Sequence, residues 1–402
     1  MNAPFFSHNR SNVTSKLDGG LLVLSAYCAI QRSNDTAFKF EQESNFWYFC
    51  GIEEPNWLLI VDGLAGKSWL VAPETNEVHK TFDGSLDYGA AKDVSGVDRV
   101  LSHDEGQDLL KDLAKRHSVA YTVFDSEHAS RFNFSLNPAL SKNKRTLERI
   151  FSSVRDCQKD IAALRAIKQP VEVEAIKKAV DLTVDAFEQV RSSISSFNYE
   201  YEVESSFTHY FRSRGATGHA YDPIVAGGLN ACTLHYVKNN DKLSRRQFVL
   251  LDIGARKNGY SADITRTYAL GNPTKRQQAV HDAVQQAQER VIEIIKPFLS
   301  FSEYQEKADK IMMEALLSLG LAKSVNDTEA LHRYMPHAIS HGLGVDVHDS
   351  LGDNKMFLEY MVLTVEPGIY IPEESIGVRI EDDVLVTNSG HNNISAKLST
   401  AW

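Results

Sequence analysis

The sequence has few cysteines, no long apolar run and no recognisable leader. Its four cysteines, Cys28, Cys50, Cys157 and Cys232, are scattered without a C-x-x-C pair, so neither a disulfide framework nor a zinc knuckle is predicted. No stretch approaches the roughly 18 uninterrupted apolar residues of a membrane span. Residues 1–20 lack the apolar segment of a signal peptide. We therefore expect free thiols, a cytoplasmic location and no membrane partner.

The charge and composition exclude further classes of protein. With a formal net charge of −10, the chain lacks the basic excess that nucleic-acid binding requires, and we expect no such partner. Hydrophobic residues make up 43% and charged residues 24% of the chain, which is typical of a globular protein and not of a disordered or collagen-like one. Because 402 residues exceed one ordinary domain, two domains are expected.

The pattern of apolar residues divides the chain into two parts. In residues 1–160, short apolar runs such as residues 21–24 alternate with helical patterns, which predicts an α/β domain. Residues 160–195 carry apolar side chains at helical spacing, and Pro170 breaks them into two helices. Residues 161–402 add further helices and clear hairpin signals, so the second domain is predicted to be α/β with a mixed or antiparallel sheet.

The strongest local signal is a hairpin that carries two aspartates. Two strand-like runs flank Asn258-Gly259, the best short hairpin turn. If these two residues form the loop, Asp252 faces Thr265, and Asp263 lies diagonally opposite Asp252 on the same face. A loop one residue earlier would place the aspartates directly opposite each other, and a three-residue loop would separate them. Aspartates within apolar strands are costly unless paired or metal-bound, so the pair predicts a metal site.

A second candidate segment is rich in histidine. His337, His341 and His348 fall within 12 residues, and the glycines between them allow the backbone to approach another group closely. Histidine is a common metal ligand and proton carrier. Each histidine alone could be a core or surface residue, and the spacing does not indicate which one is a ligand.

Two acidic positions lie further along the chain. Glu366 interrupts an apolar strand directly before Pro-Gly, and Arg379 and Glu381 lie two residues apart, on one face of another strand. A solvated ion pair on an edge strand is the alternative interpretation of Arg379 and Glu381.

These blocks, in this order, resemble the pita-bread metallopeptidase family, which includes aminopeptidase P, prolidase and methionine aminopeptidase. The matching motifs are D-x-G, D-I-T-R-T eleven residues after the first aspartate, H-x-L-G, E-P-G and R-x-E. The resemblance implies a pita-bread fold for residues 161–402. It also implies a dinuclear metal centre in which Asp263 and Glu381 bridge the ions, Asp252 binds one ion, and His341 and Glu366 bind the other.

The implied ligand set is chemically consistent. Four carboxylates and a neutral imidazole balance the charge of two divalent ions. The oxygen-rich set suits Mn²⁺, with Co²⁺ and Zn²⁺ as alternatives, and two such ions can lower the pKa of a shared water to near neutrality.

The resemblance assigns roles to other residues as well. It implies that Glu366 is the general base, that His235 interacts with the scissile amide region, and that His348 stabilises the tetrahedral intermediate. His337 would lie beside these histidines, and Arg379 would orient the carboxylates without binding metal. For His235 and His337, a role in the core or at the surface is the alternative.

The N-terminal region distinguishes among members of the family. Residues 32–51 and the following Glu54-Pro55 resemble the N-terminal domain of aminopeptidase P and prolidase, although Glu41 stands where relatives have arginine. Methionine aminopeptidases lack this domain, and creatinase lacks the metal ligands. The resemblance therefore implies an Xaa-Pro aminopeptidase, which acts on peptides with proline at the second position. An Xaa-Pro dipeptidase, or prolidase, is the alternative.

The resemblance also bears on assembly. It implies a homodimer or homotetramer, with residues 1–160 serving oligomerisation and substrate access. Relatives carry Trp-x-Gly in a loop that reaches a neighbouring subunit, whereas this chain has Phe82-Asp83-Gly84. A more distant alternative is a non-catalytic pita-bread module that binds peptides or proteins. Such modules typically lose metal ligands, and this chain retains all five.

Overall fold

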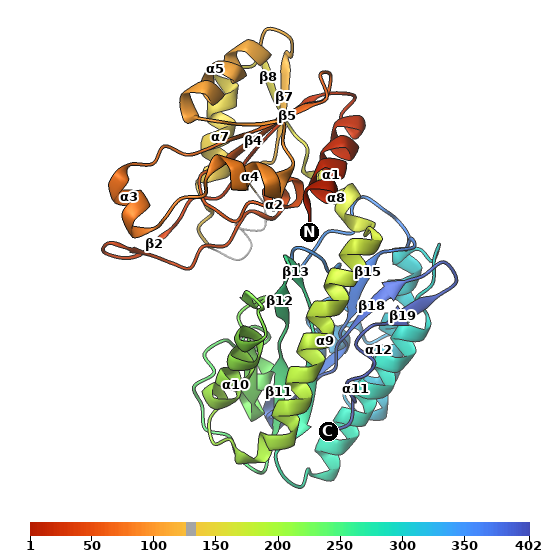
Figure 1. The fold of residues 1–402 in the computed structure, drawn as a ribbon. Helices are drawn as coiled ribbons and strands as arrows, with labels where there is room; N and C mark the ends of the chain where they lie inside the picture. Colours follow the sequence, from red (N-terminus) through yellow and green to blue (C-terminus); the bar gives the residue numbers. More distant parts are fainter. Residues whose placement is uncertain (126–133) are drawn as a thin grey trace. The chain divides into compact units, whose positions relative to one another are not determined.

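The computed structural model describes residues 1–125 and 134–402. The chain divides into two compact units, Met1–Leu164 and Arg165–Trp402, which Figure 1 colours from red to yellow and from yellow-green to blue. Helix α8 (Gln158–Ala166) spans this division. Each unit combines helices with strands, so the α/β class of both is as predicted.

The first unit is built on a six-stranded mixed sheet with the strand order β6-β5-β4-β1-β7-β8. The apolar run at residues 21–24 forms most of β1, whose five residues are all buried, as expected of a central strand covered on both faces. β1 pairs antiparallel with β4 and parallel with β7. The elements of this unit are α1 (Ala3–Lys16), β1 (Leu21–Ser25), β2 (Gln31–Ser33), β3 (Thr36–Ala37), α2 (Ser44–Cys50), β4 (Leu58–Asp62), β5 (Lys67–Val71), α3 (Glu77–Phe82), α4 (Tyr88–Ser95), β6 (Arg99–Leu101), α5 (His103–Leu113), β7 (Val119–Thr122), α7 (Ala139–Glu148) and β8 (Ser153–Asp156).

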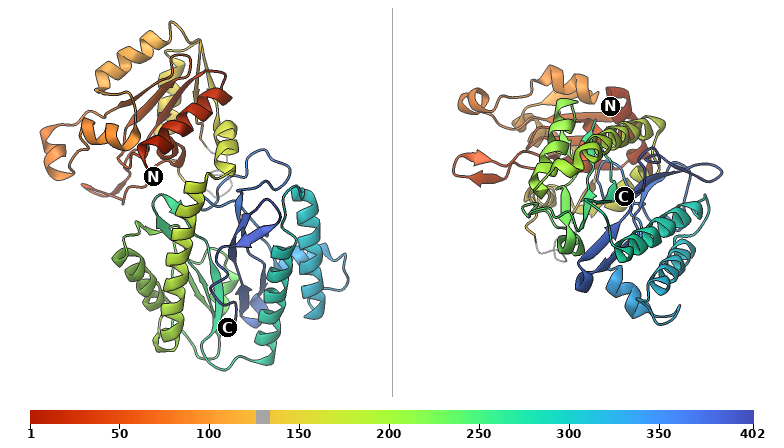
Figure 2. Two further views of the ribbon diagram at one scale, coloured as in Figure 1. Left: turned by 45° about the vertical axis from the view of Figure 1, so that its right-hand side comes forward. Right: turned by 90° about the horizontal axis from the view of Figure 1, so that it is seen from below.

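The second unit places short antiparallel sheets between helices, as Figures 1 and 2 show. α9 packs against β12 and β13, and α10 packs against β9 and β10. α11 packs against β15, β16 and β17 and contacts α12. Its helices and 3-10 turns are α9 (Pro170–Ser193), η1 (Ile194–Ser196), α10 (Glu200–Ser213), η2 (Gly228–Cys232), α11 (Lys275–Glu293), α12 (Phe301–Ser318), α13 (Thr328–Tyr334) and η3 (Pro372–Glu374). Its strands are β9 (Gly218–His219), β10 (Ile224–Gly227), β11 (Phe248–Asp252), β12 (Ala255–Lys257), β13 (Tyr260–Ser261), β14 (Thr265–Ala269), β15 (Val362–Val365), β16 (Gly368–Ile371), β17 (Ile376–Arg379), β18 (Asp382–Val386) and β19 (His391–Asn393).

Pro170 separates two helices, as predicted. α8 ends at Ala166, and α9 begins at Pro170, where the missing N–H of proline breaks no hydrogen bond because the first N–H groups of a helix have no partner within it. The Gln169 backbone N–H donates to Glu172 Oε2 at 2.9 Å, which stabilises the start of α9.

The hairpin has the predicted two-residue loop. Asn258 and Gly259 have φ values of 55° and 82°, the positive values that a type I′ turn requires at both central positions. Asp252 pairs with Thr265, so the register is the predicted one. The turn therefore places Asp252 and Asp263 on the same face of the hairpin.

The thiols and the helices of the structure agree with the predictions from sequence. All four cysteines are free thiols, and burial raises the pKa of Cys50 to about 12, which disfavours the reactive thiolate. Within residues 1–125 and 134–402, no helix combines the length and apolar character needed to cross a bilayer.

The buried His281 makes the stability of the second unit dependent on pH. Its ring packs edge-on against Phe248 with centroids 5.9 Å apart, and burial lowers its pKa from 6.5 to about 4. Between these pH values the unfolded chain binds a proton that the folded chain does not bind. The free energy of unfolding should therefore fall as the pH falls through this window.

We expect His281→Leu to remove this contribution. Between pH 7 and pH 4, the wild type should lose about 3 kcal/mol more of its free energy of unfolding than the variant loses. Urea denaturation of the metal-free proteins across this range measures it, with substitution of the exposed His332 as the matched control. A difference that does not change with pH would contradict the prediction.

Candidate metal centre

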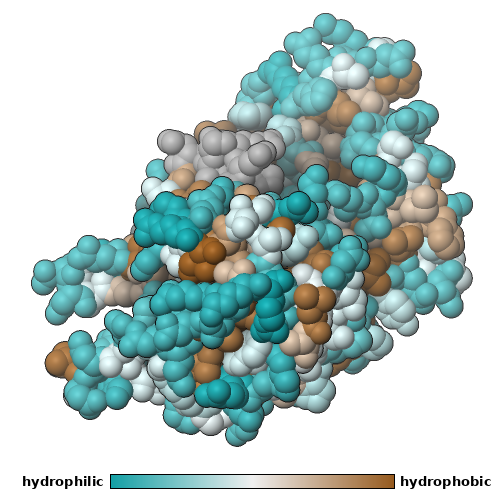
Figure 3. Space-filling view, turned by 90° about the horizontal axis from the view of Figure 1, so that it is seen from above, coloured by the Kyte–Doolittle hydropathy of each residue, from teal (hydrophilic) through white to brown (hydrophobic). Residues whose placement is uncertain are grey.

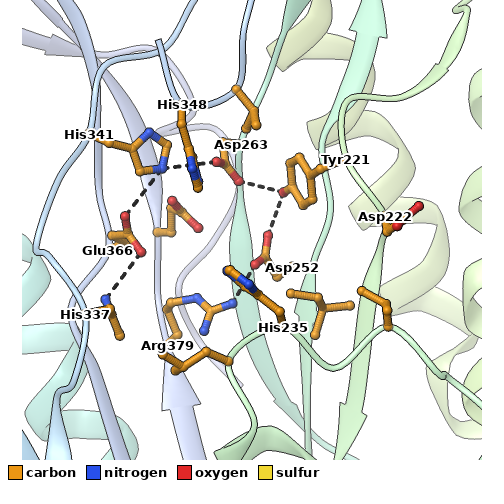
Figure 4. Close-up of a pocket in the computed structure, with 15 residues that line it drawn as sticks. Tyr221, Asp222, His235, Asp252, Asp263, His337, His341, His348, Glu366 and Arg379 are labelled. Carbon is orange, nitrogen blue, oxygen red and sulfur yellow. Dashed lines mark hydrogen bonds and ion pairs between the residues drawn. The ribbon is translucent and has the colours of Figure 1, made fainter. Parts of the chain in front are cut away.

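The hairpin around Asn258-Gly259 brings Asp252 and Asp263 close together. Asp252 ends β11, and Asp263 lies between β13 and β14. The Tyr221 hydroxyl lies 2.6 Å from Asp252 Oδ1 and 2.6 Å from Asp263 Oδ1, so it joins the two carboxylates (Figure 4). Burial, followed by the charge of both aspartates, raises the pKa of Tyr221 well above its ordinary value. The tyrosine therefore stays protonated and orients the pair.

His341 and Glu366 approach the same point from the other side. His341 Nε2 lies 3.4 Å from Asp263 Oδ2 and 3.4 Å from Glu366 Oε1. His341 Nδ1 donates to the Gly342 carbonyl at 3.0 Å. Because a carbonyl oxygen can only accept, this hydrogen bond leaves Nε2 available as a metal ligand. Glu366 directly follows β15, whose Thr364 hydroxyl lies 3.4 Å from Glu366 Oε1.

Glu381 completes the group of carboxylates. It lies between β17 and β18 and receives a hydrogen bond of 2.7 Å from the Thr265 hydroxyl to its Oε2. Ligand atoms of Asp263, His341 and Glu381 all lie within 4.8 Å of one another. This is close enough for a shared cation, since an ion with ligands at about 2.0–2.2 Å spans such a separation.

Arg379 does not form the solvated pair with Glu381 that was the alternative interpretation. Its guanidinium donates to Asp252 Oδ2 at 2.5 Å, to the Tyr370 hydroxyl at 2.8 Å and to the Thr265 hydroxyl at 3.2 Å. Arg379 and Glu381 are only 5% and 2% exposed. That alternative is therefore wrong, because both side chains are buried and the guanidinium of Arg379 binds Asp252.

The electrostatics of the group favour a cation. Burial, together with the charge of neighbouring carboxylates, raises the pKa of Glu381 and Asp263 and brings that of Glu366 to about 7. Burial disfavours the charged form of His341, yet Asp263 and Glu366 outweigh it and raise its pKa to about 9. These carboxyl groups therefore resist ionisation unless a cation compensates their charge. An oxygen-rich set with one imidazole and four carboxylates fits two divalent cations.

All nine predicted site residues line one cavity of about 400 Å³ (Figure 4). Four apolar side chains line it beside the charged groups, which gives the cavity an apolar wall. Its lining residues are Tyr221, Asp222, Ile224, Leu234, His235, Val237, Asp252, Asp263, His337, His341, Val347, His348, Glu366, Arg379 and Glu381.

The three other histidines surround the carboxylates. His337 Nε2 lies 2.8 Å from the Tyr370 hydroxyl, and the ring of His348 lies 4.3 Å from that of His341 between centroids. Burial lowers the pKa of His337 and of His348 to about 4, so both are neutral at pH 7. His235 is exposed and lines the cavity, so it is not a core residue.

Two tyrosines of the site were not identified as site residues from the sequence. Neither Tyr221 nor Tyr370 is among the residues that the sequence analysis predicts for the site. No spacing rule links a tyrosine hydroxyl to carboxylates 31 or 42 residues away along the chain. For Tyr370 the only available signal was its position four residues after Glu366 in a buried strand.

A mixed set of carboxylates and histidine in a partly apolar cavity is the arrangement of a metal-dependent hydrolase. Residues 174–388 match the model of metallopeptidase family M24, and residues 6–124 match that of the aminopeptidase P N-terminal domain. The chain therefore belongs to metallopeptidase family M24. Within this family it is a metallo-aminopeptidase of the aminopeptidase P type, as its individual relatives indicate.

The relatives match most of the chain. Human Xaa-Pro aminopeptidase 3 is 34% identical over 90% of this chain and 76% of its own length. Xaa-Pro aminopeptidase from Escherichia coli strain K12 is 32% identical over 98% of this chain and 94% of its own length. The solved structure of a putative aminopeptidase P from Bacillus anthracis has a TM-score of 0.89 and 31% identity, and it covers 99% of this chain and 96% of its own. These matches confirm the predicted family and two-domain architecture.

The close approach of the hairpin strands at Gly254 should be essential to the site. A Cβ atom at this position would collide with the Ala262 carbonyl oxygen, so Gly254→Ala must push the strands that carry Asp252 and Asp263 apart. We expect a loss of about 1–3 kcal/mol in the free energy of unfolding of the metal-free protein, measured by urea denaturation.

Gly390→Ala is the matched control. A Cβ at Gly390 would have no neighbour within 4 Å, so this variant should stay within about 0.5 kcal/mol of the wild type. Equal stability of the two variants would show that the strands tolerate separation at Gly254.

Proposed function

We propose that the chain is an Xaa-Pro aminopeptidase in which Asp252, Asp263, His341, Glu366 and Glu381 hold two divalent metal ions. The observation that carries the proposal is the gathering of these five side chains at one cavity, where their buried negative charge calls for cations. Asp263 and Glu381, which share a group of ligand atoms with His341, are the proposed bridging residues. Mn²⁺ is the proposed metal because oxygen ligands dominate, with Co²⁺ and Zn²⁺ as alternatives.

Different residues of the cavity would serve different steps of the hydrolysis. When bound, divalent ions supply Lewis acidity and a water of lowered pKa. Glu366, whose carboxylate lines the cavity, accepts a proton from the attacking water and transfers it to the leaving amine. The neutral His348 donates a hydrogen bond to the oxygen on which negative charge develops. His235 contacts the scissile amide region, with His337 beside it.

Arg379 acts by orientation. Its three hydrogen bonds fix it between Asp252, Tyr370 and Thr265, so its guanidinium holds the Asp252 carboxylate in place. Residues of this kind tune a metal site without touching the ion.

The proposed substrates are peptides with proline at the second position. Ile224, Leu234, Val237 and Val347 line the cavity together with the charged groups, and apolar side chains suit the proline ring. The family relatives are named for this activity, which supports the same assignment here.

We also propose a cytoplasmic homodimer or homotetramer in which the unit Met1–Leu164 serves in assembly and substrate access. Four free thiols support a reducing compartment. Phe38, Val78 and Phe82 in this unit are 57%, 65% and 81% exposed, and exposed apolar groups of this size are common at protein interfaces.

Glu381→Ala should lose metal and activity together. The variant loses a bridging carboxylate, so we expect fewer than two metal ions per chain by elemental analysis and a loss in kcat/KM of more than about 100-fold. In the metal-free state it should be at least as stable as the wild type, because it removes a carboxylate that its neighbours repel. Exposed Glu359→Ala is the matched control. Full activity of Glu381→Ala would exclude Glu381 as a ligand.

A matched pair of peptides tests the substrate assignment. Chelated protein reloaded with Mn²⁺ should release the first residue of an Xaa-Pro-Xaa tripeptide, because an aminopeptidase accepts residues beyond proline. Chromatography of the products measures the release. Cleavage of an Xaa-Pro dipeptide alone would make the enzyme a prolidase. Cleavage of neither peptide by metal-loaded protein would contradict both assignments.

A further inference from the structure

The segment that carries His341 and His348 is a loop closed on itself. The Asp349 backbone N–H donates to the Gly342 carbonyl at 2.8 Å, and the Leu343 N–H donates to the Val362 carbonyl at 3.0 Å. His341 directly precedes this closed segment, and His348 lies at its other end, with their rings 4.3 Å apart. The position of His348 relative to the ligand His341 therefore depends on how firmly the loop is closed.

Two buried cations hold the far end of this loop. Arg165 lies 3.0 Å from Asp349 Oδ1, and Lys168 Nζ lies 3.4 Å from Asp349 Oδ2. Lys168 Nζ also donates to the Arg165 carbonyl at 2.7 Å. Arg165, Lys168 and Asp349 are 4%, 2% and 6% exposed. Buried charges persist only when paired, and here both cations pair with Asp349, which lies 181 residues from Lys168 along the chain. Arg165 also pairs with Asp346 of the same loop at 2.6 Å.

The loop is shaped around this carboxylate. A Cβ atom at Gly344 would collide with Asp349 Oδ2 and would lie 3.1 Å from Lys168 Nζ. The loop thus contains glycine where the ion pair needs the space. The Gly344 carbonyl accepts from the Ser261 backbone N–H at 2.9 Å, which connects the loop to the hairpin that carries Asp263.

The same stretch of chain touches the other strands of the site. The Lys168 N–H donates to the Tyr360 carbonyl at 3.0 Å, just before β15 leads to Glu366. The Tyr260 hydroxyl of the aspartate hairpin lies 2.8 Å from Glu172 Oε1. Residues 165–172 therefore contact each of the segments that carry the aspartates, the histidines and Glu366.

Two neighbouring residues of the loop, His348 and Asp349, make contacts in different places. His348 lines the cavity, whereas the next residue, Asp349, is bound to Arg165 and Lys168 away from it. We propose that Lys168 and Arg165 are positioning residues, which hold Asp349 and thereby fix His348 against the reacting group. The proposal rests on the proposed function for the role of His348, but the restraint on the loop can be measured without it.

The first test is hydrogen–deuterium exchange in the metal-free protein. Lys168→Met keeps the length of the side chain and removes its charge. We expect amide exchange across residues 342–349 to become about tenfold faster or more, while residues 248–252 are unchanged. Lys177→Met is the matched control, because Lys177 is a partly exposed lysine on α9 that pairs with Glu174 at the surface. Unchanged exchange across the loop in Lys168→Met would overturn the proposal.

The second test separates positioning from general destabilisation. With an Xaa-Pro-Xaa tripeptide, Lys168→Met should lower kcat by about 10–100-fold and leave KM within about threefold, because a displaced His348 loses an interaction made in the transition state. The same substitution in a His348→Ala background should have little further effect. An equal loss in both backgrounds would overturn the proposal, since Lys168 would then act independently of His348.

A second variant covers the case in which Lys168→Met does not fold. Asp349→Asn preserves the size of the side chain and removes the only charge that Lys168 binds in the loop, leaving the pair of Arg165 with Asp346. It should therefore also accelerate exchange across residues 342–349. Slow exchange in this variant would overturn the proposal. If the wild type cleaves no Xaa-Pro peptide, the proposed function fails, and the exchange measurements alone decide whether the cations restrain the loop.

Discussion

Repulsion among four buried carboxylates is the constraint that organises the second unit. Asp252, Asp263, Glu366 and Glu381 line one cavity, and no fold retains such a set unless other groups or cations compensate it. Arg379 offsets part of the charge through Asp252. The rest remains visible in the raised pKa of Asp263, Glu366 and Glu381. Cation binding would relieve this repulsion, so metal affinity and the stability of the unit are linked.

The strands place these carboxylates by a small number of direct connections. Thr265 and Glu381 form a β-bridge, which joins the hairpin of the aspartates to the strands of the two glutamates. Behind this bridge, Arg266 donates to the Glu381 carbonyl at 2.7 Å and pairs with Asp382 at 2.7 Å, and both side chains are buried. The proposed ligand Glu381 therefore lies on backbone that is held on both sides, and sites on rigid strands keep more accurate geometry than sites on loops.

The parts of this site that could be predicted from sequence are those that depend on local rules. Asn258-Gly259 specifies a loop of two residues, and this determines the register that places Asp252 opposite Thr265. Glu381 and Arg379 are more than 110 residues from the hairpin they contact. No periodicity predicts such contacts, so their assignment depended on resemblance, and reasoning from the strand alone left open a solvated ion pair that the structure excludes.

The loop of residues 342–349 shows why the buried ion pairs could not be predicted from sequence. From sequence, Arg165 and Lys168 are two charged positions within an amphipathic helical pattern near Pro170, and Asp349 is one acid among many. They pair only because the strands of the second unit fold the loop back over the start of α9. His348 is thus placed by a loop and not by a strand, which is the less accurate of the two supports. An ion pair among residues that are almost fully buried supplies the rigidity that the loop backbone lacks, because separating the charges would leave each one without a partner in a medium of low dielectric.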